Sequence, residues 1–223
     1  MRCAVSQAFT FFMVEIVPLM ALGLAYLGWA TVPTNPTGWC ILFIGLSFVI
    51  GGPVYVLKRR KDPPARKEER GDRSFWLVQP GFILAIFGAP LEYLFLPALL
   101  PRPAWFPALG LVMVILGIIL LVWARRAIQG QFTGHLQIQP EHRLVQDGPY
   151  RFVRHPAYLG YLLLALGIGI GYSSLIAIGA VIVLLLPGLV YRLRVEEELL
   201  VEAFGEDYRR YARRTRRLFP GLW

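Results

Sequence analysis

The sequence predicts an all-α membrane protein with about six transmembrane helices and both termini in the cytoplasm. Of its 223 residues, 56% are hydrophobic, and the mean hydropathy is +0.54, well above what a soluble domain of this size needs. The apolar residues also gather in runs long enough to cross a hydrocarbon core of roughly 30 Å at about 1.5 Å per residue. Charged segments separate these runs, so each run is interpreted as membrane-spanning.

Two apolar runs near the N-terminus predict a helical hairpin. They cover residues 9–30 and 39–57, and residues 31–38 between them have the Pro, Asn and Gly content of a turn. Glu15 interrupts the first run. Because the N-terminus lacks a basic region followed by a small-residue cleavage site, we expect this run to be retained as a span. Residues 58–74 are densely charged and cannot sit in lipid, so they predict a surface loop.

Two further runs are interpreted as the third and fourth spans. The third covers residues 75–100, is expected to break at Pro80 and Pro90, and carries Glu92. The fourth covers residues 104–123. An acid inside a span costs about 2.5 to 3.5 kcal/mol at mid-bilayer and usually faces a cavity or a partner. Glu92, like Glu15, is therefore a candidate for lining the tunnel of a lipidic ligand; the alternative for Glu15 is that its side chain snorkels to the interface.

The last long apolar stretch, residues 157–191, predicts two helices. The Gly-Tyr-Ser-Ser segment at 171–174 divides it. The first half, residues 157–171, is short and rich in glycine, so it is expected to be tilted, re-entrant or closely packed against a neighbour. Pro187 is expected to kink the second helix.

The distribution of basic residues supports this layout. With six spans and the N-terminus inside, every Lys and Arg except Arg102 falls in the segments on the inner side, as the positive-inside rule requires. The long polar segment around residues 124–156 and the C-terminal tail then lie on the same cytoplasmic face. They can therefore contribute to a single site.

Composition also bears on the classes of partner. The net charge is +9 and the sequence pI is about 9.9, but the basic residues alternate with apolar spans, so we expect them to meet membrane lipids and not nucleic acid. Cys3 and Cys40 lie at opposite ends of a predicted span, which argues against a disulfide, redox chemistry or a metal site. The excess of arginine over lysine hints at a bacterial source, and hence at the bacterial inner membrane.

The stretch HRLVQDGPYRFVRHPAYLG, residues 142–160, concentrates the groups that carry chemistry. Gly148 and Pro149 interrupt local structure, and Pro156 suits the first position of the following helix. A helix that starts beside Arg154 and His155 is suited to hold a carboxylate or a phosphate. The alternative is that these residues only anchor a membrane helix at the interface.

The tail, residues 192–223, predicts an amphipathic helix. Binding to anionic lipid explains its many arginines. It does not explain the acidic run Glu196, Glu197 and Glu198, which falls where the last span meets the headgroups. We therefore divide the chain into a four-span membrane region, residues 1–131, and a catalytic region, residues 132–223, made of a loop, a two-helix hairpin and the tail helix.

The segments GPYRFVRHPAYLG and EEELLVEAFGEDYRRYARRTRRLFPG together resemble the isoprenylcysteine carboxyl methyltransferase and phospholipid methyltransferase family. The resemblance covers residues 132–220. It implies an integral membrane enzyme that uses S-adenosylmethionine, held between the Arg-His-Pro helix start and the Glu-Glu helix. A loop at 132–142 that is shorter than in the eukaryotic enzymes is a departure from the family pattern.

The resemblance also implies the site residues. Arg154 matches an essential family arginine, Arg192 the substrate-side arginine, and Glu197 is assigned a catalytic role with them. A family glutamine falls at Gln137 or Gln139. The cofactor contacts are expected from Gln137, His142, Arg143, Leu144, Val145, Tyr150, His155, Pro156, Ala157, Tyr158 and Glu196.

The expected reaction is methylation of a carboxylate on a lipidic or prenylated substrate that enters from the bilayer. A carboxylate with a pKa of about 3.5 is ionised near neutral pH and needs no general base, whereas an amine acceptor would need His142, His155 or a glutamate as base. An N-methyltransferase of phospholipid amines and a methyltransferase of small lipidic thiols remain alternatives. More distant ones are an NADPH-dependent membrane reductase of the sterol type and a non-enzymatic scaffold.

Overall fold

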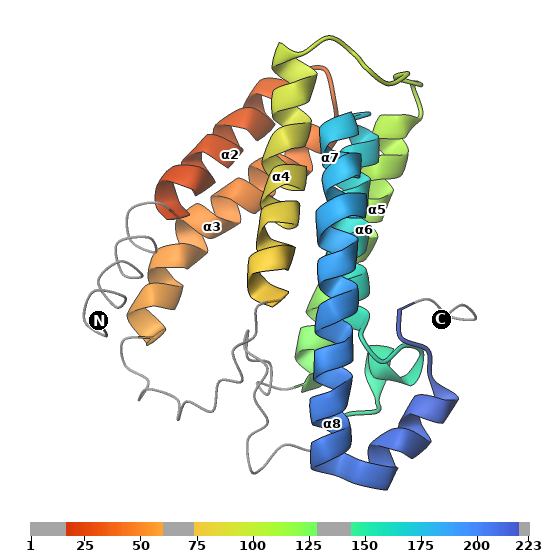
Figure 1. Cartoon of the computed structure of the whole chain (residues 1–223). Helices are drawn as coiled ribbons and strands as arrows, with labels where there is room; N and C mark the ends of the chain where they lie inside the picture. The colour runs from red at the N-terminus through yellow and green to blue at the C-terminus, as the bar shows by residue number, and fades with distance from the viewer. Residues whose placement is uncertain (1–16, 60–73, 129–143, 219–223) are drawn as a thin grey trace.

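The computed structural model describes residues 17–59, 74–128 and 144–218. Within these ranges every regular element is a helix, apart from one isolated β-bridge, so the all-α prediction is confirmed. Figure 1 shows long helices running side by side, with the first hairpin leaning to one side. The elements are α2 (Val17–Thr31), α3 (Thr37–Arg59), α4 (Ser74–Phe95), α5 (Phe106–Ile128), η2 (Gly148–Arg151), α6 (Pro156–Gly171), α7 (Leu175–Ala180), η3 (Val181–Leu185) and α8 (Leu186–Arg214).

Three helices in the described ranges are long and apolar enough to cross a membrane: Val78–Phe95, Phe106–Ile128 and Leu175–Arg214. Three shorter apolar helices lie beside them: Leu19–Thr31, Thr37–Ser47 and Pro156–Gly171. The membrane character is therefore confirmed, while the count of six spans stays a prediction. The predicted charged loop, Glu15 and the proposed boundary at residue 131 fall outside the described residues, in whole or in large part.

The expected breaks at Pro80 and Pro90 are wrong, because both prolines lie inside the continuous helix α4. In hydrocarbon an unpaired backbone group costs several kcal/mol, so a membrane helix keeps its remaining hydrogen bonds around a proline. The predicted third span is also too long at its end. Helix α4 stops at Phe95, and residues 96–105 form the connection to α5.

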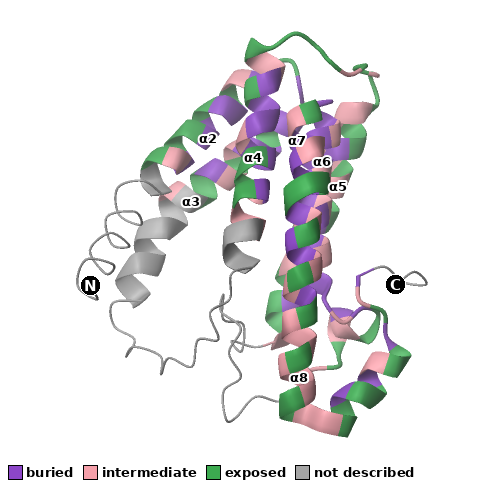
Figure 2. Cartoon of the chain, in the orientation of Figure 1, coloured by how far each residue is buried: buried purple, intermediate pink, exposed green. Residues whose placement is uncertain are grey.

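Close packing of α5 on α6 depends on glycines that face each other. A Cβ atom added to Gly110 would lie 2.5 Å from the carbonyl oxygen of Gly167, and one added to Gly117 would lie 2.8 Å from that of Gly160. Small residues let two helix backbones approach where lipid offers no hydrophobic driving force. The prediction of close packing for residues 157–171 is therefore confirmed, and Figure 2 shows buried residues concentrated where α4, α6 and α7 meet.

The turn after α6 leads into a rod made of α7, η3 and α8 (Figure 1). The rod stays helical through Pro187, so the kink expected there remains a prediction. A π turn over Val181–Leu185 precedes this proline, and π turns are a common way to absorb an irregularity in a helix. The sharp change of direction occurs at Gly205, with φ 53° and ψ −124°, values that favour glycine. The last part of α8 therefore folds back beside the bundle, which the sequence did not predict.

Glu92 serves a structural purpose that differs from the tunnel lining we expected. The residue is 3% exposed, and its carboxylate accepts hydrogen bonds from Ser174 Oγ at 2.5 Å, Leu175 N at 3.1 Å and Ile176 N at 2.9 Å. A carboxylate at this position satisfies unpaired N–H groups and favours the positive end of the helix dipole. Glu92 therefore caps the start of α7.

The close approach of α5 and α6 gives a test. Gly110→Ala should destabilise the protein strongly, because the new methyl group meets the backbone of α6. Gly179→Ala is the matched control: nothing lies within 4 Å of its added Cβ, so it should preserve stability or raise it by about 0.5 to 1 kcal/mol. Thermal unfolding in detergent would measure both, and equal melting temperatures would contradict the packing described.

Candidate active site

The segment before α6 takes its shape from Gly148 and Pro149. Gly148 has φ 62° and begins the 3-10 turn η2, with Pro149 as its second residue. The turn closes with a 3.1 Å hydrogen bond from Phe152 N to Pro149 O. Pro156 occupies the first turn of α6, after His155 at the N-cap position. The predicted interruption and the predicted helix start are both confirmed.

The end of the tail lies directly beside this segment. Val153 and Arg216 form a parallel β-bridge, Arg154 N donates to Arg216 O at 2.7 Å, and His155 N donates to Arg217 O at 3.1 Å. Backbone hydrogen bonds therefore join two segments about 60 residues apart. This pairing brings the side chains of the tail to the start of α6.

The Arg154 side chain holds the end of α8. It is 10% exposed, and its Nη1 atom donates to the carbonyl oxygens of Ala212 and Thr215, at 2.8 and 2.5 Å. Carbonyl groups in the last turn of a helix lack helical partners, and a cation there also interacts favourably with the helix dipole. The geometry makes Arg154 a positioning residue for the tail.

Glu197 is the acidic centre of the cluster. Its Oε1 atom accepts from Arg154 Nε at 3.0 Å, and its Oε2 atom accepts from Arg217 Nε at 3.0 Å and Nη2 at 2.9 Å. His155 Nε2 lies 3.4 Å from Oε1. One carboxylate thus links the start of α6, the middle of α8 and the end of the tail.

The cluster lies beyond the hydrocarbon. The helical stretch from Leu175 to Arg214 has 40 residues and turns at Gly205. Even its part before Gly205 is longer than the roughly 20 residues that a core of roughly 30 Å requires, and its charged residues begin at Arg192. Burial would raise the pKa of Glu197, but the hydrogen bonds from His155 and Arg217 and the charge of Arg154 outweigh burial and lower the pKa to about 2. Glu197 therefore stays ionised.

Glu196 forms a second polar group with Tyr158 and Arg192. The Tyr158 hydroxyl donates to Glu196 Oε2 at 2.6 Å and accepts from Arg192 Nε at 2.8 Å. His155 Nδ1 lies 3.9 Å from Glu196 Oε1. The Glu196 side chain is 28% exposed, against 14% for Glu197. Glu196 is thus the carboxylate of this pair that a ligand can reach.

Three tyrosines lie between η2 and the end of α8. Tyr211 donates its hydroxyl hydrogen bond to Tyr150 O at 2.7 Å, and the Tyr208 and Tyr211 rings lie edge to face with centroids 6.0 Å apart. Tyr208 is 2% exposed, yet its hydroxyl has no hydrogen-bond partner among the described residues. Burial, with the nearby Glu197 carboxylate, raises the pKa of Tyr208. A protonated phenol is therefore available as a donor to a bound group.

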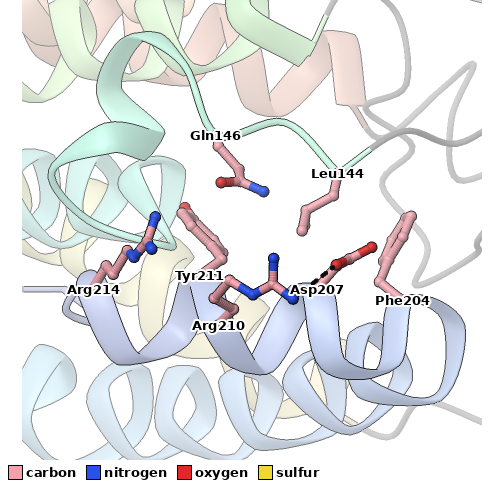
Figure 3. A pocket seen from close by; sticks show the side chains of 7 residues that line it. All are labelled: Leu144, Gln146, Phe204, Asp207, Arg210, Tyr211 and Arg214. Atoms are coloured by element: carbon pink, nitrogen blue, oxygen red, sulfur yellow. Dashed lines mark ion pairs between the residues drawn. The ribbon is translucent and has the colours of Figure 1, made fainter.

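A cavity of about 380 Å³ opens between the loop before η2 and the end of α8, a volume in the range of small-molecule sites. Figure 3 shows Leu144 and Gln146 approaching from the loop and the other side chains rising from the helix. Arg210 and Asp207, whose charged atoms are 4.0 Å apart, supply both signs of charge. The lining residues are Leu144, Gln146, Phe204, Asp207, Arg210, Tyr211 and Arg214.

The structure therefore brings together most of the site predicted from the sequence. Arg154, His155 and Tyr158 lie against Glu196 and Glu197, and Pro156 and Ala157 are buried in the same helix start. Leu144 lines the cavity, whereas Val145 and Tyr150 do not; Tyr150 accepts a hydrogen bond from Tyr211 through its backbone oxygen. Gln137, Gln139, His142 and Arg143 lie outside the described residues.

Sequence reasoning missed two groups in this region. The sequence predicts lipid binding for Arg217 as for the other tail arginines, but Arg217 pairs with Glu197. Tyr208 belongs to a motif that carried the family resemblance, yet nothing in the sequence marked its hydroxyl as unpaired. An arginine whose carboxylate partner lies 20 residues away could not have been distinguished from its neighbours by spacing.

The sequence of this chain is similar to those of known proteins. A family model described as phospholipid methyltransferase matches residues 105–207. The chain is 32% identical over 149 residues to a probable protein-S-isoprenylcysteine O-methyltransferase of Oryza sativa. The aligned region covers 65% of this chain and 78% of the rice protein. The chain belongs to the protein-S-isoprenylcysteine O-methyltransferase family. Protein-S-isoprenylcysteine O-methyltransferase B of Arabidopsis thaliana is similarly close, with 33% identity over 64% of this chain and 75% of that protein.

The fold agrees with a solved member of this family. The eukaryotic intramembrane Ras methyltransferase ICMT, an isoprenylcysteine carboxyl methyltransferase, matches with a TM-score of 0.50 and 19% identity over 98% of this chain and 86% of that chain. The similarity supports the helical membrane fold. With the family established by sequence, the chain is a membrane methyltransferase, and the reductase and scaffold alternatives are set aside.

The role of Arg154 in holding the tail can be tested by hydrogen exchange. Arg154→Gln removes the bonds to the last carbonyls of α8 and leaves Glu197 without one of its cations, so amides of residues 208–218 should exchange at least several-fold faster. The control is Arg151→Gln, because Arg151 is exposed and, among the described residues, its guanidinium meets the Phe152 ring at 5.9 Å and forms no ion pair. Equal exchange in both variants would contradict the positioning role.

Proposed function

We propose that the protein is an S-adenosylmethionine-dependent methyltransferase that acts on the carboxylate of a prenylated cysteine or a similar lipidic acid. The observation that carries the proposal is the contact between Tyr158 and Glu196, with Arg192 on the same hydroxyl, at the point where the apolar rod ends. The relatives named protein-S-isoprenylcysteine O-methyltransferases support this choice of acceptor.

The described residues fit the proposed methyl donor. S-adenosylmethionine carries an ammonium, a carboxylate and a sulfonium, so its site needs groups of both charges. Glu196 is the accessible acid, the Tyr208 hydroxyl is an uncommitted donor, and Arg210 and Arg214 supply positive charge in the adjoining cavity. Charge-assisted hydrogen bonds of this kind are roughly twice as strong as neutral ones.

When bound, S-adenosylmethionine would supply a methyl group on a sulfonium cation. The protein would align the reactants and exclude water from the site. Tyr158 fixes the orientation of Glu196, Arg192 faces the acceptor side, and the Arg154–Glu197–Arg217 ion pairs hold α6, α8 and the tail in one arrangement. Alignment and removal of water are sufficient sources of catalysis where a carboxylate and a sulfonium lose their charges together.

The state of Glu197 favours a carboxylate acceptor over an amine. An ammonium must lose a proton before it can accept a methyl group, so an amine acceptor needs a general base. Glu197, with a pKa of about 2 and both oxygens engaged by cations, is poorly suited to that role. An amine acceptor keeps some support from the phospholipid methyltransferase description of the matching family model.

We further propose that the acceptor enters from the bilayer and that the cluster faces the cytoplasm of a bacterial cell. Among the described residues, Arg102 belongs to the connection between α4 and α5, at one end of the bundle, whereas the segments that carry the other arginines and lysines lie toward the end with the cluster (Figure 1). That asymmetry is the one expected for a cytoplasmic face.

Binding of the methyl donor can be measured by calorimetry on the detergent-purified protein. S-adenosylmethionine should bind and NADPH should not. Tyr208→Phe should weaken binding about five- to tenfold, as expected for one lost hydrogen bond, and Glu196→Gln by about tenfold or more. Tyr191→Phe, an exposed tyrosine of α8, is the matched control and should bind like the wild type. Undiminished affinity in both test variants would remove this cluster from the donor site.

The acceptor class can be tested by turnover. A small S-prenylated cysteine with a free carboxylate should be methylated, its carboxamide should not, and phosphatidylethanolamine should be a poor acceptor. The rate should change little between about pH 6 and 8, because the acceptor carboxylate and Glu197 are both ionised throughout. A rate that rises steadily with pH, together with methylation of the amine, would instead indicate an N-methyltransferase.

A further inference from the structure

A second cavity lies at the end of the bundle opposite the Arg154–Glu197 cluster. Its volume is about 360 Å³. It lies where the α2–α3 turn, the α4–α5 connection and the turn after α6 come together (Figure 1). The lining residues are Thr34, Asn35, Pro36, Tyr93, Arg102, Pro103, Ala104, Pro107, Ala108, Gly171, Tyr172 and Ser173.

This cavity lies at a membrane surface. The connection at residues 96–105 joins two helices that are long and apolar enough to cross a membrane, so it must lie at the boundary between hydrocarbon and water. Trp29, Trp39 and Trp105 are all exposed at the ends of helices on this side. Tryptophan is enriched at that boundary, where lipid phosphates also lie.

The Arg102 guanidinium lies at the edge of the cavity and has no carboxylate partner among the described residues. Its guanidinium carbon lies 4.5 Å from the centre of the Tyr93 ring, and the guanidinium makes no ion pair with any residue in the described ranges. A guanidinium that stacks on a ring keeps its edge N–H groups free for a planar or tetrahedral anion. None of the twelve lining residues is acidic.

The ring beneath Arg102 is held in place by a chain of contacts. The Tyr93 hydroxyl donates to Thr34 O at 3.3 Å, and the Tyr93 ring meets the Tyr172 ring edge to face at 5.4 Å. The Tyr172 hydroxyl in turn shares a 2.7 Å hydrogen bond with that of Thr31. Such preorganisation reduces the entropy lost when Arg102 binds a ligand.

Two more donors line the same cavity. Ser173 is 6% exposed, has φ 51°, and its hydroxyl forms no hydrogen bond with the described residues. This conformation belongs to the end of α6, where Ser173 N donates to Ile170 O at 2.9 Å and Ser174 N to Gly169 O at 2.8 Å. Asn35 uses one amide hydrogen on Gly171 O, at 2.8 Å, which leaves the second available. Glu92, the nearby acid, is engaged by the start of α7.

From this combination we infer that the cavity binds the phosphate group of a membrane lipid, in the leaflet opposite the proposed methyl-transfer site. Arg102, Ser173 and Asn35 donate to the phosphate oxygens, and the apolar proline and alanine lining contacts the glycerol region. The site does not depend on the proposed reaction, because none of its residues belongs to the Arg154–Glu197 cluster.

The test is binding of short-chain lipids to the purified protein in a neutral detergent. Dihexanoyl phosphatidylglycerol should bind to the wild type and raise its melting temperature. Arg102→Gln and Ser173→Ala should each weaken that binding, Arg102→Gln by roughly tenfold, as expected for a lost charge-assisted hydrogen bond. Arg126→Gln, at an exposed arginine on the opposite end of α5, is the control and should leave the affinity unchanged.

Two further probes distinguish binding of the intact lipid from binding of its phosphate or its diacylglycerol part alone. Inorganic phosphate and dihexanoylglycerol should each bind far more weakly than the intact lipid. Unchanged affinity in either Arg102→Gln or Ser173→Ala would overturn the assignment of the cavity. Equal binding of inorganic phosphate would overturn the lipid as its ligand, and an equal loss in Arg126→Gln would show attraction to the overall positive charge.

Discussion

The proposed site depends on the Glu197 carboxylate and the two arginines that hold it. Arg154 comes from the segment before α6, Glu197 from the middle of α8 and Arg217 from the end of the tail. Arg154 and Glu197 are largely excluded from water, at 10% and 14% exposed, so these two charges need each other, whereas Arg217 is 30% exposed. Removing one partner of such a buried pair leaves an uncompensated charge, which typically costs about 3 to 5 kcal/mol. The arrangement of the whole polar end therefore follows from this one set of ion pairs.

The position of that end is fixed by a second constraint, the thickness of the membrane. The α7–α8 rod is longer than the hydrocarbon core, so its charged half must extend beyond it. Gly205 then reverses the direction of the chain, and backbone pairing of Val153 with Arg216 returns the tail to the start of α6. A polar cluster is thereby built at a membrane surface, within reach of both water and lipid.

The two ends of the bundle satisfy their polar groups in different ways. At the Arg154–Glu197 end, carboxylates and guanidinium groups satisfy each other across three segments. At the other end, the turns are joined by neutral hydrogen bonds, such as Asn35 to Gly171 and Thr31 with Tyr172, and by the carboxylate of Glu92 at the start of α7. Glycines between the ends let α5 and α6 approach closely. The Arg154–Glu197 end can therefore carry chemistry, while the hydrogen bonds at the other end and the glycines maintain the bundle.

The sequence by itself determined the class of the protein and the composition of its site. Apolar length identified the membrane helices, because hydrocarbon thickness sets a simple requirement on residue number. The Arg-His-Pro and Glu-Glu segments identified the family, and Arg154, His155, Tyr158, Glu196 and Glu197 do lie together. Such inferences succeed because they depend on composition and local order.

The tertiary structure alone decided what each polar group does. Pro80 and Pro90 stay within α4, although local rules predict a break. Glu92 caps a helix that begins 83 residues later in the chain, and Arg154 binds carbonyl groups 58 and 61 residues away. The unpaired hydroxyl of Tyr208 is likewise a property of its surroundings. Hydrogen bonds and ion pairs depend on distances between segments that no local pattern encodes, so their partners became known only from the fold.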